Sequence, residues 1–304
     1  MYKTFHIILG LLVLFLALSC NREGGELRVP ISFSVGKYSA EVKADESEGI
    51  GIENFGVFAN LPDTSPSKLL MENAKVKDKG SYWGTEESYY WPNGQGRMLD
   101  FYAYSPYSAN PSDIGLDFSF DATTGMPSFE FTMSETADVD LMVAENEGCT
   151  AAGGPVSLTF KHLLCRVQFS FSVSDEGGFS YLVNMIKVNG TPRVATYDWV
   201  TDSFHVHETG SVEIHIQEDT DDHLIDSSTP MLIDAFTMYL MPGNLGEVEI
   251  KINNDPPKVL DMTEMELEEG MGMNVHFEVS LADISYTTAV TDWLEGGTAS
   301  GDIS

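Results

Sequence analysis

VSLTFKHLLCRVQFSFSV, residues 156–173, is the stretch that decides the fold. The apolar residues of its first part stand at even positions, and those of its second part stand at odd positions. The first set is Val156, Leu158, Phe160 and Leu164, and the second is Leu163, Cys165, Val167, Phe169, Phe171 and Val173. Because successive residues of a strand point to opposite faces of a sheet, this change moves the buried set to the other face. The sequence therefore predicts a bulge, a bend or a change of sheet near 161–164, at a hinge between two all-β halves.

Two residues of this stretch, His162 and Cys165, suggest a nucleophile with its base. At a spacing of three on a strand their side chains face opposite sides unless a bulge intervenes. We therefore interpret both as packed core residues, and the stretch as the entry strand of the second half.

Length and charge restrict the classes of function. The chain has 304 residues, a length that favours two domains. Its 16 basic and 47 acidic residues give a net charge of −31. Nucleic-acid binding needs clustered Lys and Arg, so no nucleic-acid partner is expected. The three cysteines, Cys20, Cys149 and Cys165, provide no disulfide framework.

Residues 1–19 have the pattern of a signal peptide. Lys3 precedes an apolar run at 5–18 that is too short to span a bilayer. The run ends in LALSC, which resembles a bacterial lipoprotein box, with Ala17 in the place of the usual large apolar residue. Cleavage before Cys20 and acylation of its thiol would hold the mature chain at a membrane surface. The alternative is an ordinary secretory peptide with an incidental cysteine, and both interpretations predict export.

Short alternating strands fill the mature chain. The first is LRVPISFSV, whose alternating apolar residues are Leu27, Val29, Ile31, Phe33 and Val35. Pro30 suggests an edge strand, and an acidic, glycine-containing connection follows at 36–51. The segment at 88–106 predicts a hairpin with aromatic residues on both faces, so both faces should be covered. Strands of this kind, separated by turn residues, favour antiparallel β-sandwiches.

A segment of small residues at 149–155 suits a linker. The expected organisation is a signal peptide at 1–19, an N-terminal β-sandwich domain at 20–152 and a C-terminal β-sandwich domain at 153–304.

Candidate chemistry is sparse. His205, His207 and His215 lie in two strands that would suit a metal site, but the apolar residues between them are typical of a strand with one solvated face. The acidic run at 218–222 lacks the spacing of a calcium loop and is interpreted as an exposed turn. Motifs for hydrolysis, phosphate binding or zinc proteolysis do not occur. We therefore predict no catalytic residue, no metal, no cofactor and no enzymatic activity.

An aromatic group offers a second functional interpretation. It comprises Trp83, Tyr89, Tyr90, Trp91, Tyr102, Tyr104 and Tyr107. Exposed together, such rings would form a platform on which sugars stack. Their alternation within strands favours core packing instead.

Five segments in order resemble the fimbrillin family, including its Mfa-like members. They are YYWPNGQGRMLDFYAYSP, VDLMVAEN, VSLTFKHLLCRVQFSFSV, FTMYLMPG and ISYTTAVTDWLEGG. Members of this family are lipoprotein-derived subunits of the type V pili of Gram-negative oral and gut bacteria. The resemblance implies two tandem transthyretin-like β-sandwich domains and export as a lipoprotein. It also implies that in stalk subunits a protease removes the first strand, and that another subunit's terminal strand fills the vacated groove.

Each part of that mechanism has a counterpart in this sequence. The removable first strand would be Leu27, Val29, Ile31, Phe33 and Val35. The cleavage linker would contain Lys37 and Lys43 but no Arg, whereas the cut in the best-known members follows Arg. The donor strand would be Val275, Phe277, Val279 and Leu281, continued by Ile284 and Tyr286.

The expected function is that of a stalk, tip or anchor subunit of a fimbria on the cell outer membrane. Its partners would be other fimbrial subunits, the outer membrane through lipid at Cys20, and a glycan or protein on a host or bacterial surface. The alternative is a monomeric surface lipoprotein that binds glycan through exposed aromatic residues.

Overall fold

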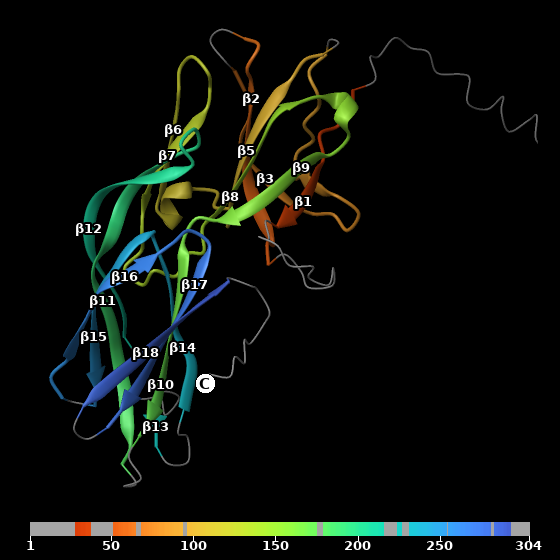
Figure 1. Cartoon of the computed structure of the whole chain (residues 1–304). Coiled ribbons are helices and arrows are strands. Elements are labelled where there is room, and N and C mark those ends of the chain that lie inside the picture. Colours follow the sequence, from red (N-terminus) through yellow and green to blue (C-terminus); the bar gives the residue numbers. More distant parts are fainter. Residues whose placement is uncertain are drawn as a thin grey trace, which may run out of the picture.

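The structure is a computed structural model that describes nine stretches of the chain (Figure 1). They are residues 28–37, 51–64, 68–93, 96–174, 179–215, 224–226, 231–253, 255–280 and 283–292. Strands β1 to β18 and two short 3-10 helices, η1 (Pro111–Ile114) and η2 (Ala151–Gly153), make up the secondary structure of these stretches. The all-β prediction is confirmed. The predicted signal peptide, Cys20, Leu27, Lys43, Leu281 and the acidic run at 218–222 lie outside the described residues.

Seven strands close into a barrel in the order β1-β4-β3-β2-β5-β8-β9. Their bounds are Phe33–Lys37 for β1, Asn54–Leu61 for β2, Lys68–Asp78 for β3, Trp83–Thr85 for β4, Leu99–Ser105 for β5, Met142–Cys149 for β8 and Val156–His162 for β9. Phenylalanine rings fill the barrel core, and Phe33 packs edge-on against both Phe55 and Phe101. The first half is thus a barrel closed by its first strand, where the sequence predicted a sandwich.

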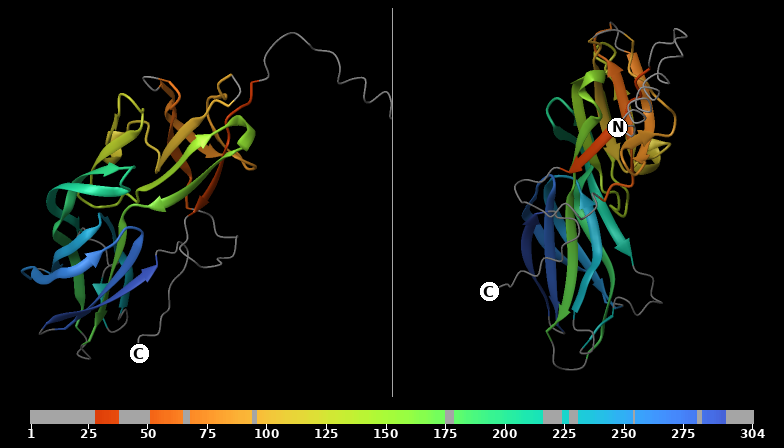
Figure 2. Two further views of the ribbon diagram at one scale, coloured as in Figure 1. Left: turned by 45° about the horizontal axis from the view of Figure 1, so that its top comes forward. Right: turned by 90° about the vertical axis from the view of Figure 1, so that its right-hand side faces the viewer.

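The remaining strands form two sheets that pack into a sandwich below the barrel (Figures 1 and 2). One sheet has the order β14-β10-β17-β18, with bounds Met231–Leu240, Cys165–Val173, Met271–Val279 and Ile284–Asp292. The other has the order β16-β15-β11-β7-β6, with bounds Lys258–Leu267, Gly243–Ile252, Tyr181–Asp198, Pro127–Thr132 and Leu116–Phe120. Strands β12 (Ser203–His215) and β13 (Leu224–Ile225) pair with β11 beside this path.

The change of parity in 156–173 marks a change of sheet. Strand β9 ends at His162 and β10 begins at Cys165, so the break falls where the sequence placed it. The apolar residues of β9 face the barrel core, and those of β10 face the sandwich core. The expectation that the whole stretch enters the second half is wrong, because β9 pairs with β1 and β8 of the barrel.

Strands also cross the expected boundary in the other direction. The hairpin of β6 and β7 comes from the N-terminal half, yet β7 pairs with β11, as in the opposed residues Phe129 and Tyr197. The sandwich core continues into the outer face of the barrel, since it includes Phe58, Tyr102 and Tyr104 from β2 and β5. The limits 20–152 and 153–304 remain a prediction about folding units, whereas the sheets themselves exchange strands across them.

Both faces of β5 are covered, as the aromatic alternation predicted. Leu99, Phe101 and Ala103 lie in the barrel core, and Tyr102 and Tyr104 lie in the sandwich core. The partner predicted for this strand is wrong, because β5 pairs with β2 and β8 while residues 89–91 hydrogen-bond to 29–31.

A polar clamp joins the two halves where β9 ends. The Lys161 ammonium pairs with Asp202 and, at 2.8 Å, with Glu269, two residues from turns of the sandwich. The Tyr197 hydroxyl also donates to Asp202. Burial alone would lower the pKa of Lys161, but its hydrogen bonds to both carboxylates raise it above its usual value. The main chain adds a link, since the Gly270 amide donates to the Leu164 carbonyl oxygen at 3.1 Å.

Replacing Lys161 with methionine is expected to cost about 1–2 kcal/mol of the free energy of unfolding, since it leaves the half-buried Glu269 carboxylate without its cation. Lys258→Met is the matched control, because Lys258 forms a more exposed ion pair with Asp283 and should cost less than about 0.5 kcal/mol. Urea denaturation of both variants measures the difference. Equal losses would show that the clamp contributes no more than a surface ion pair.

Candidate functional site

The first strand completes the barrel wall, and its apolar side chains point into the barrel core. Ile31 and Phe33 are buried, and Val35 packs partly against the same core. Val29 departs from this pattern, with 46% of its surface exposed. The predicted removable strand therefore contributes at least three of its alternating apolar residues to the barrel core.

The backbone of β1 is held unequally on its two sides. On one side, Phe33–Lys37 pairs in parallel with Val156–Phe160 of β9. On the other side, the described residues give a single β4 pair, Phe33 with Trp83. Before β1, the Ile31 amide donates to the Tyr89 carbonyl oxygen at 2.9 Å and anchors the approach to the strand.

Without β1, the barrel would become an open, incomplete sheet. Strands β9 and β4 would each expose an unpaired edge, and the site of Phe33 would become an apolar groove floored by Phe55 and Phe101. Unpaired strand edges beside an apolar groove form a template that an added strand can satisfy.

One of the two predicted cleavage residues, Lys37, lies at the exit of this strand. Lys37 is the last residue of β1, and its backbone lies opposite Phe160 of β9. It therefore belongs to the strand ladder rather than to the linker in which the sequence placed it. Lys43 falls outside the described residues.

The predicted donor residues Val275, Phe277 and Val279 are buried in the sandwich core. They lie in β17, which pairs in parallel with β10 on one side and antiparallel with β18 on the other. A strand paired on both sides has no free edge, so β17 lies inside its own sheet here, and its assignment as a donor stays a prediction. Alternation of apolar residues could not reveal this, because an internal strand and a donor strand alternate alike.

Strand β18, unlike β17, lies at the edge of the sheet. It pairs with β17 alone among the described strands. Tyr286 is exposed although its ring lies 6.4 Å from that of Phe277, and Val290 exposes 66% of its surface. The sequence had named Ile284 and Tyr286 as a continuation of the donor, and these residues open β18.

The aromatic group does not form one exposed platform. Trp91, Tyr102 and Tyr104 are buried, which confirms the core interpretation for these three. Burial raises the pKa of the Tyr104 phenol to about 12. The rings that remain exposed include Tyr90, which bridges to Pro30 and so belongs to the anchoring of the first strand.

His162 and Cys165 are both buried, as predicted. The imidazole Nδ1 of His162 lies 2.7 Å from the Asp140 carboxylate, and the thiol of Cys165 faces the sandwich core. Burial raises the pKa of that thiol to about 12. A thiol with such a pKa stays protonated near neutral pH and is a poor nucleophile.

The three candidate metal ligands on β12, His205, His207 and His215, are exposed. His207 Nε2 lies 2.7 Å from the Thr196 hydroxyl, and His215 pairs with Glu213 of its own strand. Across the described stretches, no three His, Cys, Asp or Glu side chains group as a metal site. The same stretches contain no helix long and apolar enough to cross a membrane.

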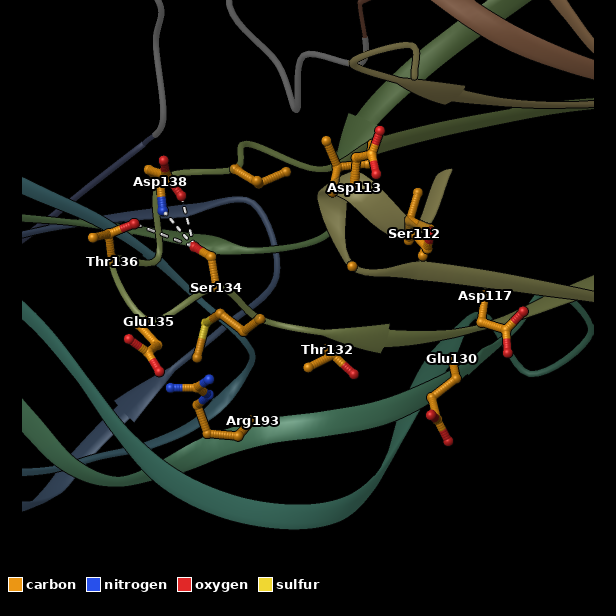
Figure 3. A pocket seen from close by; sticks show the side chains of 15 residues that line it. Ser112, Asp113, Asp117, Glu130, Thr132, Ser134, Glu135, Thr136, Asp138 and Arg193 are labelled. Carbon is orange, nitrogen blue, oxygen red and sulfur yellow. Dashed lines mark hydrogen bonds between the residues drawn. The ribbon is translucent and has the colours of Figure 1, made fainter. Parts of the chain in front are cut away.

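A hollow of about 660 Å³ lies between η1 and the loop that follows β7 (Figure 3). Its rim carries the carboxylates of Asp113, Asp117, Glu130, Glu135 and Asp138. Asp138 is held by the Ser134 hydroxyl at 2.6 Å, and the Arg193 guanidinium donates to the Ser211 carbonyl oxygen. Asp138 and Arg193 are thus engaged within the fold, and the described lining brings no nucleophile and base together.

Three solved structures share this fold. A fimbrial protein from Bacteroides vulgatus superposes with a TM-score of 0.58 at 16% sequence identity, covering 86% of this chain and 99% of its own. A protein described as a cell adhesion protein from Bacteroides uniformis gives a TM-score of 0.58 at 17% identity, covering 88% of this chain and 99% of its own. One from Bacteroides ovatus gives 0.57 at 14%, covering 89% and 99%. The comparison with curated proteins gave no significant match.

The overall fold of this chain is thus shared with proteins described as fimbrial and cell-adhesion proteins. The family model described as fimbrillin-like matches residues 44–293, and the chain belongs to this fimbrillin-like family. Membership supports a role as a fimbrial subunit at the cell surface and implies assembly with other fimbrial subunits. The members of this family are structural adhesion proteins rather than known enzymes.

Proposed function

We propose that this chain is a structural subunit of a fimbria that is exported as a lipoprotein through Cys20 and assembled by β-strand exchange. In this proposal β1 is a provisional strand, which a partner's strand replaces. Lipid at Cys20 would hold the subunit at the outer membrane before assembly, or permanently in an anchor. The assembled fimbria would support adhesion to a host or bacterial surface.

The observation that carries this proposal is the position of β1. It fills the barrel core with Phe33, yet it comes from the extreme N-terminal end of the described chain and connects at Lys37 to residues 38–50. A cut in that connection would release a strand held by pairing and packing alone. Among the described residues, the β9 side of the strand carries a continuous ladder and the β4 side a single pair.

The proposed donor is β18, because its side chains suit the groove of β1. Ile284, Tyr286 and Val290 share one face of a strand, as Ile31, Phe33 and Val35 do, although polar Thr288 stands between Tyr286 and Val290 on that face, so these side chains can enter a core from one side. Detaching β18 breaks pairing with one neighbour, whereas detaching β17 would break pairing with two and expose buried Phe277. We further propose that the two halves are variants of the transthyretin-like sandwich, the first closed into a barrel.

Strand uptake tests this function directly. A chain lacking residues 20–37 should bind a fluorescent peptide of residues 284–292, whereas the chain that retains β1 should not, because β1 occupies the groove. Fluorescence anisotropy measures binding. A peptide with Ile284, Tyr286 and Val290 changed to serine is the control for apolar insertion.

Absence of binding by the truncated chain, with its β-sheet circular dichroism intact, would rule out exchange with this donor. Equal binding of the serine peptide would show that the groove does not select apolar side chains.

A further inference from the structure

The outer face of β3 carries a group of lysines in a chain that is otherwise strongly acidic. Lys75 and Lys77 lie on this strand, and Lys79 follows it directly. Lys77 is paired with Gly84 of β4, so Lys75 and Lys77, two residues apart, lie on the same face of the sheet as that glycine. In a chain with a net charge of −31, such a concentration of cations favours an anionic partner at this surface.

The three lysines act together on one carboxylate, that of Glu86. The Lys77 ammonium lies 2.9 Å from Glu86 Oε1. The hydrogen bond and the charge of Lys77, with the charges of Lys75 and Lys79, hold the pKa of Glu86 below its usual value. Within the part of the chain that the structure describes, Lys75 and Lys79 have no ion-pair partner of their own. The group therefore already holds one carboxylate and keeps positive charge for another.

An exposed aromatic ring lies beside these cations. The Lys79 amide donates to the Tyr82 carbonyl oxygen at 2.9 Å and closes the turn between them. The Asp78 carboxylate accepts the amide of Gly80 at 2.6 Å and so holds the same turn. A Cβ added to Gly84 would lie 2.8 Å from the Tyr82 ring and 3.7 Å from Lys79 Cγ. The ring and the lysine stem thus lie side by side over the bare backbone of Gly84, and 50% of the Tyr82 surface is exposed.

A second ring lies at the other end of the group. The Lys75 ammonium lies over the half-buried Tyr107 ring, 5.1 Å from its centre, and this cation–π contact holds the ammonium in place. Aromatic rings beside ammonium groups suit a ligand that presents a flat apolar face next to an anion. An acidic sugar has both, because its C–H groups stack on a ring while its carboxylate binds ammonium groups. A run of acidic side chains offers the charge without the flat face.

We propose that Tyr82 and Lys79, with Lys75 and Lys77 beside them, bind an acidic saccharide on the surface to which the fimbria adheres. The sugar ring stacks on Tyr82, and its carboxylate binds Lys79 as the Glu86 carboxylate binds Lys77. This inference rests on the proposed function, because it names the chemical class of the ligand for adhesion. It does not require strand exchange.

Saccharide binding to the uncut chain from residue 20 onward tests the site. The probes are a fluorescent oligogalacturonate, an oligosaccharide of hyaluronan and sialyllactose, and fluorescence anisotropy at low ionic strength measures their affinity. Methyl esters of the same sugars keep the rings and remove the charge, whereas a polyglutamate peptide keeps the charge and lacks the rings. We expect at least one acidic saccharide to bind about tenfold more tightly than its methyl ester and than the peptide.

Substitutions then locate the site. Tyr82→Ser and Lys79→Gln should each weaken binding by about three- to tenfold. Gly84→Ala keeps both side chains but displaces the Tyr82 ring, so it should weaken binding similarly. Tyr286→Ser and Lys258→Gln are the matched controls, because they change an exposed ring on β18 and a partly exposed lysine on β16 and should leave the affinity unchanged. Circular dichroism checks that each variant is folded.

Equal binding of polyglutamate would overturn the saccharide as the ligand and would favour an acidic protein instead. No binding of the three acidic saccharides, or unchanged affinity in all three site variants, would overturn the site itself. Either result leaves strand exchange intact. Failure of strand uptake by the chain lacking residues 20–37 would overturn assembly by exchange and would leave this saccharide site in place.

Discussion

Replacing Phe33 with alanine is expected to lower the free energy of unfolding by about 3–5 kcal/mol. The ring is fully buried and touches two other rings of the barrel core, at centroid distances of 5.9 Å to Phe55 and 5.7 Å to Phe101. Its removal leaves a cavity between strands that a single β4 pair holds together on one side. Urea denaturation followed by circular dichroism measures the loss.

Val29→Ala is the matched control for this prediction. Val29 belongs to the same N-terminal segment but is largely exposed, so its truncation should change stability by less than about 0.5 kcal/mol. Similar losses in the two variants would mean that β1 does not complete the core in solution. The proposal that it is a provisional strand would then lose its structural basis.

Replacing Gly246 with alanine is expected to cost a similar amount, about 3–5 kcal/mol, because two separate penalties add. The backbone of Gly246 has a φ of +92°, a conformation that residues with a Cβ rarely adopt. A Cβ there would also overlap the carbonyl oxygen of Asn189, which lies in the neighbouring strand β11. Gly246 sits where the pairing of β15 with β16 shifts register, so the sheet cannot relax without losing that shift.

Gly80 separates the two penalties. Its φ of +90° is nearly the same, but no atom lies within 4 Å of the position that a Cβ would occupy. Gly80→Ala should therefore show the backbone penalty alone, about 1 kcal/mol. Thermal unfolding of both variants compares them, and equal losses would show that the contact with Asn189 relaxes freely.

The sequence located the change of sheet correctly because two cores impose two parities. Up to Phe160 the buried residues stand at even positions and face the barrel core. From Cys165 they stand at odd positions and face the sandwich core, because the chain passes from one sheet to the other between them. The same logic predicted the two covered faces of β5. In each case the pattern of apolar residues within one short segment shows which side chains are buried, so the feature can be predicted from that segment alone.

The pairing partners of the strands were less predictable, because the residue pattern of one strand does not show which other strand lies beside it. Nothing in residues 116–132 indicated that β6 and β7 would join the sheet of the other half. Residues 181–198 form one strand, β11, whose pairing with β12 shifts register near Pro192. The burial of β17 and the exposure of β18 were unpredictable for the same reason, since each follows from the place of the strand inside its sheet or at the edge.

The aromatic core shared by the barrel and the sandwich has a mechanical consequence. Phe58 of the barrel packs 4.7 Å from Phe118 of the sandwich sheet, and Tyr102 packs 5.3 Å from Trp199, so no hydrated gap separates the two halves there. A tensile load on one half is therefore transmitted to the other through packed rings as well as through the covalent chain. Each subunit would behave as a stiff rod, and the bending of a fibre built from such rods would be concentrated at the joints between subunits.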